Sequence, residues 1–349
     1  MPHYVITGGA GFIGSNLADY YLSNSHRVTI LDNFSRPGSE RNRAWLESRH
    51  GSRLKTVRAD VATADRNLIQ TVAGADVVFH LASQVAVTSS VADPRHDFEV
   101  NALGTFNVLE AARQAAPQPV VVYSSTNKVY GRLADLGIVE RPGRYAFASL
   151  SGGIGEDRAL DPHSPYGCSK CAGDQYALDY ARVYGLRTIV FRQSCIYGPR
   201  QFGGEDQGWL AWFAMRAIER KPVTIYGDGK QVRDALYVED LVAAYDAAVR
   251  HIDATAGRAY NIGGGPENTL SLLELIEMLN RRKGCKLECS FEAWCPGDQP
   301  VFISNLARAK ADFGWQPKVG IEEGIERLMD WIKGNDVLLE RPVAMEERA

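Results

Sequence analysis

The chain has 349 residues, of which 45% are hydrophobic and 23% are charged, and its formal net charge is −3. This length suits one large domain or two closely joined domains, and the charge argues against the strongly basic surface of a nucleic-acid-binding protein. No apolar stretch approaches the ~20 residues needed to cross a bilayer. The first residues run directly into a strand-like segment and show no signal peptide, so we expect a cytoplasmic protein.

The six cysteines do not form the pattern of a disulfide framework or of a metal site. Cys168 and Cys171 have CxxC spacing, but no second close pair accompanies them. Cys285, Cys289 and Cys295 are spaced irregularly. We therefore expect reduced structural thiols and no bound metal.

Strand-like and helix-like segments alternate strictly in the first half of the chain. The predicted strands are 4–7, 28–31, 54–58, 77–80, 120–124 and 188–192. The predicted helices are 14–23, 41–49, 65–72, 98–115 and 165–184. This alternation indicates an α/β fold with a Rossmann-type, doubly wound parallel sheet covered by helices on both faces.

A glycine-rich turn lies between the first predicted strand and the first predicted helix. Gly8, Gly11 and Gly14 form a GxxGxxG pattern, which lets the backbone turn tightly and approach a pyrophosphate at the helix N-terminus. Asp32, at the end of the second strand, can accept both hydroxyls of an adenosine ribose and would repel a 2′-phosphate. The pattern predicts NAD, although Arg36 follows closely and could hold the 2′-phosphate of NADP.

A tyrosine and a lysine stand at i and i+4 in the sequence HSPYGCSK. Ser164 suits a helix N-cap, so Tyr166 and Lys170 are expected on one face of the following helix. The nearby ammonium is expected to lower the pKa of Tyr166 from about 10. Such a tyrosine can take a proton from a sugar hydroxyl while hydride leaves the same carbon for nicotinamide. Thr126, in YSST, can hydrogen bond to the same hydroxyl.

After residue 192 the loops lengthen, and helices at 270–282 and 321–332 alternate with short strand-like pieces. We predict an NAD-binding domain over 1–192 and about 232–260, a substrate domain over 193–231 and 261–334, and a loose tail over 335–349. The connection over 131–163 is far longer than an ordinary loop, so we expect a lid over the site.

These residues together resemble the extended short-chain dehydrogenase/reductase family of NAD-dependent nucleotide-sugar epimerases and dehydratases. The segments YGPR (197–200), GDGKQVRDALYVEDL (227–241) and YNIGGG (260–265) also match the family pattern, and the resemblance extends to about Trp331. It implies a nucleotide-diphosphate sugar as substrate and a homodimer or homotetramer assembled through the helices at 98–115 and 165–184. It also implies tightly bound NAD+, contacted by Gly8, Gly11, Phe12, Ile13, Gly14, Asp32, Asn33, Asp60, Val61, Leu81, Ala82, Tyr166 and Lys170.

Two residues after the threonine decide between reactions of this family. Its dehydratases carry an acidic pair directly after the catalytic threonine, whereas this chain has Asn127 and Lys128. Neither can act as a carboxylic acid or a carboxylate base, which leaves epimerisation by transient oxidation and return of hydride. The other interpretation is a variable loop whose side chains face solvent.

The stretches YSSTNKVYG, HSPYGCSK and GPRQFGGEDQGWLAWF most resemble a branch that inverts C2 of a CDP-linked 3,6-dideoxyhexose, such as CDP-paratose to CDP-tyvelose. A UDP-hexose 4-epimerase would use the same catalytic residues and is the alternative. A different class is a non-catalytic NAD-binding regulatory protein, whose expected sign is loss of Tyr166 or Lys170; both are present.

The resemblance implies substrate contacts from Gln84, Thr126, Asn127, Cys195, Gln207 and Arg233. Arg233 resembles a bidentate clamp on the diphosphate, or it forms a surface ion pair with Asp234. Asp60 bonds the adenine amino group or caps the next helix. Asn101 is expected to support the strand that carries the threonine.

Several positions in the second half carry open alternatives or departures from the family. Asp206, Gln207 and Trp209 could recognise the nucleotide base, or Trp209 and Trp212 could pack in the core. The family often has asparagine at the position of Cys195 and arginine at that of Cys295, and the position of Pro300 is frequently basic. These departures leave open whether the carrier nucleotide is CDP or UDP.

Overall fold

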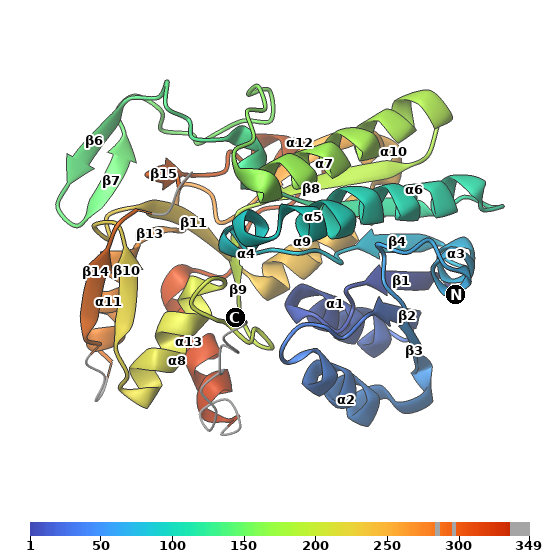
Figure 1. Cartoon of the computed structure of the whole chain (residues 1–349), viewed down its shortest axis with the longest axis horizontal. Coiled ribbons are helices and arrows are strands. Elements are labelled where there is room, and N and C mark those ends of the chain that lie inside the picture. The colour runs from blue at the N-terminus through green and yellow to red at the C-terminus, as the bar shows by residue number, and fades with distance from the viewer. Residues whose placement is uncertain (283–286, 295–297, 336–349) are drawn as a thin grey trace.

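The computed structural model describes residues 1–282, 287–294 and 298–335 (Figure 1). Its largest sheet contains β1 (His3–Thr7), β2 (Arg27–Asp32), β3 (Leu54–Arg58), β4 (Val77–His80), β5 (Val120–Thr126), β8 (Thr188–Gln193) and β12 (Arg258–Ile262). All neighbours in this seven-stranded sheet are parallel, in the order β12-β8-β5-β4-β1-β2-β3. The order reverses between β1 and β4, and the carboxyl ends of strands at such a switch point form the usual ligand site of α/β proteins.

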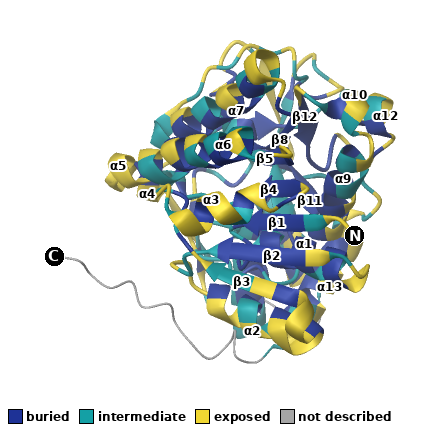
Figure 2. Ribbon diagram, turned by 90° about the vertical axis from the view of Figure 1, so that its right-hand side faces the viewer, coloured by how far each residue is buried: buried dark blue, intermediate teal, exposed yellow. Residues whose placement is uncertain are grey.

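Helices cover both faces of this sheet. One face is covered by α1 (Phe12–Ser23), α2 (Ser39–His50), α9 (Val238–Arg250), α10 (Ile252–Thr255) and α12 (Ala307–Phe313); the other is covered by α3 (Arg66–Ala73), α4 (Val87–Ala92), α6 (Gly104–Gln114) and α7 (Ser164–Tyr184). Side chains alternate between the faces of a strand, so Tyr4 and Ile6 belong to one core cluster and Val5 to the other. Figure 2 shows the buried strands between helices that are exposed on their outer sides.

The predicted α/β fold is confirmed. The six predicted strands and six of the seven predicted helices lie within two residues of their expected bounds. The seventh strand, β12, was not predicted. Short 3-10 turns, η1 (Gly51–Arg53) and η3 (Asn127–Tyr130), follow α2 and β5.

The helix predicted over 98–115 was wrong in its start and its continuity. It consists of α5 (Pro94–Phe98), a π-helical turn η2 (Glu99–Leu103) and α6. Asp93 accepts a hydrogen bond from the His96 amide at 3.0 Å, and Pro94 takes the first position, so the helix begins earlier. The Thr105 hydroxyl donates to the Asn101 carbonyl at 2.6 Å, and such side-chain insertion accompanies a break in the regular ladder.

The rest of the chain forms smaller sheets around a separate core. β9 (Cys195–Tyr197), β11 (Val232–Tyr237), β13 (Thr269–Ser271) and β15 (Val301–Phe302) form one sheet, and β10 (Val223–Tyr226) pairs with β14 (Cys289–Glu292). Helices α8 (Trp209–Glu219), α11 (Leu272–Asn280) and α13 (Ile321–Lys333) pack in this core. β11 thus pairs in the smaller sheet, whereas α9 and β12 join the large one. The division into domains stays a prediction.

The connection over 131–163 contains the hairpin β6 (Ile138–Arg141) and β7 (Arg144–Phe147). The Tyr145 amide donates to the Lys230 carbonyl at 2.8 Å, and the Ile154 amide donates to the Ile303 carbonyl at 2.7 Å. The segment is therefore attached to the smaller sheets, and its role as a lid stays a prediction.

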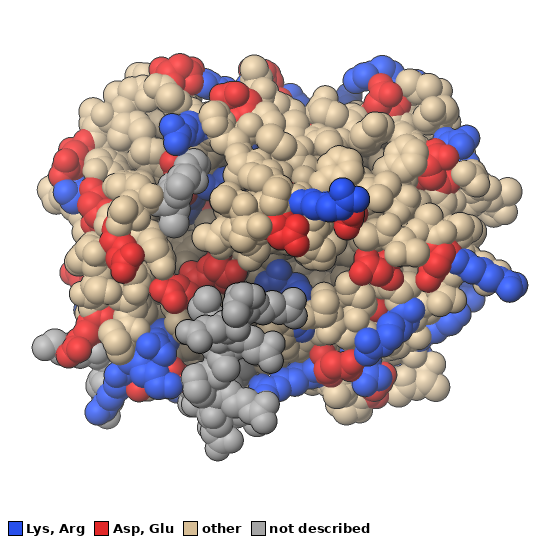
Figure 3. All heavy atoms as spheres, in the orientation of Figure 1, with Lys and Arg blue, Asp and Glu red and all other residues tan. Residues whose placement is uncertain are grey.

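Lys and Arg are interspersed with Asp and Glu on the face shown in Figure 3, without a broad basic patch. No helix in the described ranges is long and apolar enough to span a membrane. Within these ranges no three potential His, Cys, Asp or Glu ligands gather as a metal site.

Candidate active site

A cavity of about 650 Å³ opens at the carboxyl ends of the large sheet, next to the switch point. It is lined by the glycine turn, by residues that follow β2, β3, β4 and β5, by the start of α7, and by the loop before α8. All fourteen predicted cofactor and catalytic positions and two predicted substrate positions are among its lining residues: Gly8, Gly11, Phe12, Ile13, Gly14, Asp32, Asn33, Asp60, Val61, Leu81, Ala82, Thr126, Tyr166, Lys170, Gln84 and Gln207.

The glycine turn has no room for side chains. Gly8 has a φ of +66°, and a Cβ there would lie 2.7 Å from the Ala82 nitrogen. A Cβ on Gly14 would lie 2.3 Å from the Gly8 carbonyl oxygen. The turn is closed by a hydrogen bond from the Gly11 amide to the Gly8 carbonyl at 3.0 Å, and α1 begins directly after it. Backbone at the start of a helix is thereby exposed to the cavity, as a pyrophosphate requires.

Asp32 lies at the end of β2, where its carboxylate faces the glycine turn. One carboxylate oxygen accepts from the Ala10 amide at 3.0 Å, and the other accepts from the Phe34 amide at 2.8 Å. Burial raises the pKa of this carboxyl, and the two amide hydrogen bonds act in the opposite direction. Each carboxylate oxygen can accept more than one hydrogen bond, so both can still bind ribose hydroxyls.

Asp60 accepts a hydrogen bond from the side-chain amide of Asn33, the residue after Asp32, at 2.9 Å. The alternative in which Asp60 caps the next helix is wrong. That helix, α3, is capped by Asp65, which accepts from the Leu68 amide at 2.8 Å. Asp60 is therefore free of a capping role and lines the cavity.

Asn101 fixes the loop that follows β4. Its side-chain oxygen accepts from the Gln84 amide at 3.0 Å and from the Ser83 hydroxyl at 2.7 Å, and its nitrogen donates to the Gln84 carbonyl at 3.0 Å. The Gln84 side chain donates to the Ala86 carbonyl at 2.8 Å, and its oxygen has no hydrogen-bond partner. Asn101 thus positions the backbone of a cavity wall.

Thr126, Tyr166 and Lys170 come together at the inner end of the cavity. Thr126 is the last residue of β5, and the two others lie on the first turns of α7, where the Ser164 hydroxyl accepts from the Gly167 amide at 3.3 Å. The Lys170 nitrogen lies 4.5 Å from the centre of the Tyr123 ring. The arrangement places a hydroxyl, a phenol and an ammonium around one point, which suits proton transfer to and from a bound hydroxyl.

Burial controls the protonation of both groups. It raises the pKa of Tyr166 to about 12, while hydrogen bonding with Thr126 acts in the opposite direction. Burial also lowers the pKa of Lys170 to about 7, against the effect of Asp97 and Asp174. The expected decrease of the tyrosine pKa by Lys170 was therefore wrong for the chain alone, because removal from water outweighs the hydrogen bond with Thr126 and the charge of Arg36.

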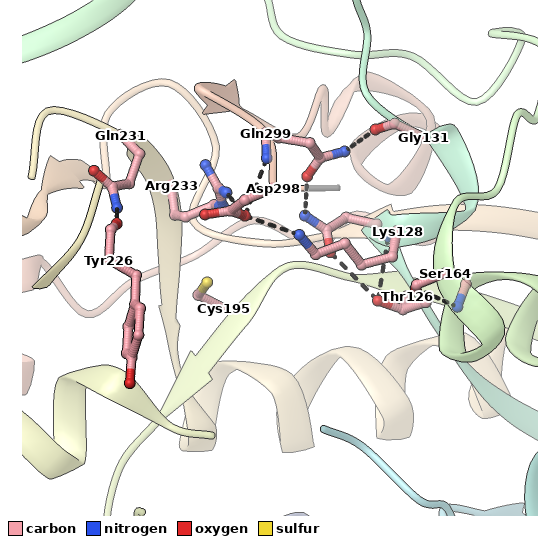
Figure 4. Close-up of polar contacts among 12 residues, drawn as sticks. Thr126, Lys128, Gly131, Ser164, Cys195, Tyr226, Gln231, Arg233, Asp298 and Gln299 are labelled. Carbon is pink, nitrogen blue, oxygen red and sulfur yellow. Dashed lines mark hydrogen bonds and ion pairs between the residues drawn. The ribbon is translucent and has the colours of Figure 1, made fainter. Parts of the chain in front are cut away.

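Asn127 and Lys128 contact other parts of the chain, so the alternative of a loop whose side chains face solvent was wrong; Figure 4 shows Lys128 directed at Asp298. Asn127 is buried and accepts from the Thr126 hydroxyl at 3.3 Å. Its side-chain nitrogen lies 3.5 Å from the oxygen of Gln299. The Lys128 ammonium forms an ion pair with Asp298 at 3.1 Å.

Arg233 is buried and shares this carboxylate. Its guanidinium lies 2.7 Å from the Asp298 oxygen that also contacts Lys128. The proposed surface pair with Asp234 is wrong, because Asp234 is fully buried and accepts from the Ser194 hydroxyl and from the amides of Gly265 and Ser304. Asn127, Cys195 and Arg233 are not among the residues lining the cavity.

Two residues of this group, Asp298 and Gln299, were not identified from the sequence. They lie in the sequence CPGDQP, and the presence of polar residues there does not indicate which distant residues these two side chains contact. Their pairing with residues more than 60 positions away is set by β15 beside β11. Cys295 lies outside the described residues; Pro300 is described, and its carbonyl accepts from the Val232 amide at 2.8 Å.

The loop before α8 closes the other side of the cavity. Asp206 and Gln207 line it, and the Gln207 side chain accepts a hydrogen bond from Arg36. Trp209 donates to the Cys195 sulfur at 3.5 Å, and Trp209 and Trp212 both pack against the core of the smaller sheets. The core-packing interpretation of the two tryptophans is thus supported by their contacts.

Comparison with known proteins defines the class of this site. Residues 4–263 match the model of the NAD dependent epimerase/dehydratase family, and the chain belongs to that family. The expected family, fold and NAD dependence are confirmed.

Relatives and solved structures cover almost the whole chain. It is 44% identical over 335 residues to a CDP-paratose 2-epimerase of Salmonella typhi, with 94% of this chain and 98% of the relative covered. It is 33% identical to a UDP-glucose 4-epimerase of Mycolicibacterium smegmatis, with 94% and 98% covered. The structure is similar, with a TM-score of 0.83 and 29% identity, to the UDP-glucuronic acid 4-epimerase of Bacillus cereus in complex with UDP-glucuronic acid and NAD, with 95% and 99% covered.

Proposed function

We propose that this protein inverts C2 of a CDP-linked 3,6-dideoxyhexose, in the sense of CDP-paratose to CDP-tyvelose, by oxidising C2 and returning the hydride to the opposite face. The observation that carries the proposal is the pair Asn127 and Lys128 directly after Thr126, which lines the cavity together with Tyr166 and Lys170. The pair provides no acid and base for removing water. The 44% identity to a CDP-paratose 2-epimerase supports the choice of sugar and nucleotide.

The residues present fit NAD. The glycine turn leaves no space for a Cβ beside the expected pyrophosphate, and Asp32 offers carboxylate oxygens for the ribose. NAD+ bound there would supply a hydride acceptor and a positive charge at the inner end of the cavity. Lys170 would hold the adjacent ribose.

In the proposed reaction the residues of the chain handle the proton. Thr126 orients the C2 hydroxyl by a hydrogen bond. Tyr166 takes the hydroxyl proton as hydride leaves C2; it does so as the phenolate, which the positive charge of bound NAD+ would favour over the neutral phenol of the chain alone. The planar C2 ketone then presents its other face, and Tyr166 returns the proton when hydride is added back. Direct removal of the C2 proton is unfavourable, because no carbonyl flanks this carbon in such a sugar.

No carboxylate among the described residues that line the cavity is suited to compete with this chemistry; Asp97 and Asp174, which act on Lys170, do not line it. The carboxylates among the cavity-lining residues are Asp32, Asp60 and Asp206, of which the first two lie at the glycine-turn end. Asp298 is held between two cations that lower its pKa to about 2, so it is a poor proton donor and a weak base.

We also propose a homodimer that forms through α6 and α7. These helices expose apolar side chains that a monomer would leave in water, namely Phe106, Tyr176, Val183 and Tyr184, and Leu103 at the end of η2 adds to them. The Phe106 and Tyr176 rings lie 5.9 Å apart and join the two helices into one apolar face. Such a face on two neighbouring helices fits a four-helix contact with a second copy.

A panel of nucleotide sugars tests the proposed function. The protein as purified is incubated, without added cofactor, with CDP-3,6-dideoxyhexose, UDP-glucose and UDP-glucuronic acid, and the products are identified by NMR. We expect inversion at C2 of the CDP-sugar only. Inversion at C4 of a UDP-sugar would instead assign a UDP-hexose 4-epimerase, and no conversion of any sugar would favour a regulatory NAD-binding protein.

A further inference from the structure

Lys128 links the catalytic threonine to the group around Arg233. The Lys128 amide lies 3.3 Å from the Thr126 hydroxyl oxygen, so the backbone of the lysine is fixed next to the reacting end of the site. Its ammonium reaches Asp298 Oδ1 at 3.1 Å, and Arg233 Nη2 reaches the same oxygen at 2.7 Å. Figure 4 shows the side chains of Lys128 and Arg233 converging on this carboxylate.

This group carries a surplus positive charge. Two cations and one carboxylate leave a net charge of +1, and Asp298 stays ionised because the pair of cations lowers its pKa to about 2. The Lys128 and Asp298 side chains are 21% and 24% exposed although neither lines the cavity, whereas the Arg233 side chain is only 9% exposed. Cations that share one carboxylate oxygen are also spaced to share a phosphate oxygen.

The structure of the sugar relates the position of Lys128 to the carbon that lies at Thr126. C2 is bonded directly to C1, the carbon that carries the diphosphate, whereas C4 lies across the ring. When the C2 hydroxyl is at Thr126, the diphosphate must therefore lie close to the turn that follows β5. When the C4 hydroxyl is there, the diphosphate lies on the far side of the ring. A cation two positions after Thr126 can meet the diphosphate only in the first arrangement.

We propose that Lys128 binds the phosphate attached to C1 and thereby sets which carbon is oxidised, favouring C2 over C4. Asp298 holds the ammonium in place and occupies the position of the phosphate oxygens until the nucleotide sugar arrives. Arg233 then contacts the same diphosphate from its other side. This inference rests on the proposed function, because it takes a nucleotide-diphosphate sugar as the ligand.

Nucleotide binding to the protein as purified tests the phosphate contact. Dissociation constants of CDP and CMP are measured by calorimetry for the wild type and for K128Q, D298N and K221Q. K221Q is the control, because it removes another lysine–carboxylate ion pair, with a distance of 3.2 Å, at the end of α8. K128Q is expected to weaken CDP binding roughly 10- to 100-fold, as loss of a charge-assisted hydrogen bond predicts, and to leave CMP binding nearly unchanged. K221Q is expected to bind both nucleotides like the wild type.

D298N separates a phosphate contact from a merely structural ion pair. Removal of the competing carboxylate is expected to tighten CDP binding, opposite in sign to the effect of K128Q. If the lysine only stabilised the turn through Asp298, both variants would weaken CDP and CMP alike. An unchanged ratio of CDP to CMP affinity in K128Q would overturn the inference, even if the wild type inverts C2.

The position of oxidation gives a second readout. We expect K128Q to form the C4 epimer of the CDP-sugar beside the C2 epimer, and to show a raised KM. A K128Q enzyme that inverts C2 alone, with an unchanged KM, would contradict the assigned role. Failure of the wild type to invert C2 of any sugar would instead refute the proposed function. The affinities for CDP and CMP would still test the phosphate contact in that case.

Discussion

At the scale of single residues, burial decides the charge of groups that pairing alone would not predict. Tyr166 and Lys170 were correctly expected on one face of a helix, but spacing cannot show how much water reaches them. Burial raises the pKa of Tyr166 and lowers the pKa of Lys170, and both shifts favour the neutral form of the group. The same effect acts on His80, at the end of β4.

His80 predicts a measurable pH dependence of stability. It is fully buried, its ring nitrogens lie 2.7 and 3.0 Å from the hydroxyls of Thr7 and Thr105, and burial lowers its pKa to about 3. The unfolded chain has the ordinary value of about 6.5, so it binds more protons between these pH values and stability falls as the pH decreases from 6.5 to 3. This group alone should cost the wild type ~2 kcal/mol between pH 7 and pH 5.

Urea unfolding of the wild type and of His80→Gln at pH 7 and pH 5 measures this effect. The free energy of unfolding should decrease less in the variant, by about that amount. Comparison of the two decreases removes the contribution of the carboxylates, which titrate in both proteins. An equal decrease in both would show that His80 is not held neutral.

Residue roles that depend on distant partners could not be predicted. The sequence pattern identified Gly8, Asp32 and Tyr166, because each belongs to a local motif with a physical reason for its spacing. Asp298 has no such local signal, since its partners come from η3 and β11. For the same reason, the alternative interpretation of Arg233 named Asp234 as its partner and not Asp298.

At the scale of elements, the alternation of strands and helices was predictable because both sheet faces are buried, which gives continuous apolar strands. The π-helical turn at Glu99–Leu103 was not, since the apolar pattern of 98–115 continues through it. The hairpin over Ile138–Phe147 was missed because its first strand is exposed and lacks alternation. The glycine turn was predicted, and its geometry makes a sharp test.

Gly14→Ala should disrupt the cofactor turn. The added Cβ would lie 2.3 Å from the Gly8 carbonyl oxygen and 2.7 Å from the Gly9 Cα, so the turn must open. We expect the purified variant to contain far less NAD than the wild type, measured after denaturation. Gly320→Ala is the matched control, because nothing lies within 4 Å of its added Cβ and the φ of Gly320 is −71°. Full NAD content in Gly14→Ala would contradict the assigned pyrophosphate site.

At the scale of the whole molecule, the apolar face of α6 and α7 predicts association. Phe106→Glu places a charge in the proposed contact and should convert the wild-type oligomer to monomers in sedimentation experiments. Phe291→Glu is the control: Phe291 is 57% exposed on β14, away from these helices, and its replacement should leave the oligomer intact. A monomeric wild type, or an unaffected Phe106→Glu oligomer, would refute this interface.

The central claim is that one hydride leaves C2 and returns to the same carbon. The most direct measurement uses CDP-3,6-dideoxyhexose carrying deuterium at C2, incubated in ordinary water with the protein as purified, with Tyr166→Phe as an inactive control that keeps its NAD. We predict that the C2-inverted product retains the deuterium at C2, as read by NMR and mass spectrometry. Replacement of that deuterium by hydrogen from water during inversion would contradict the account.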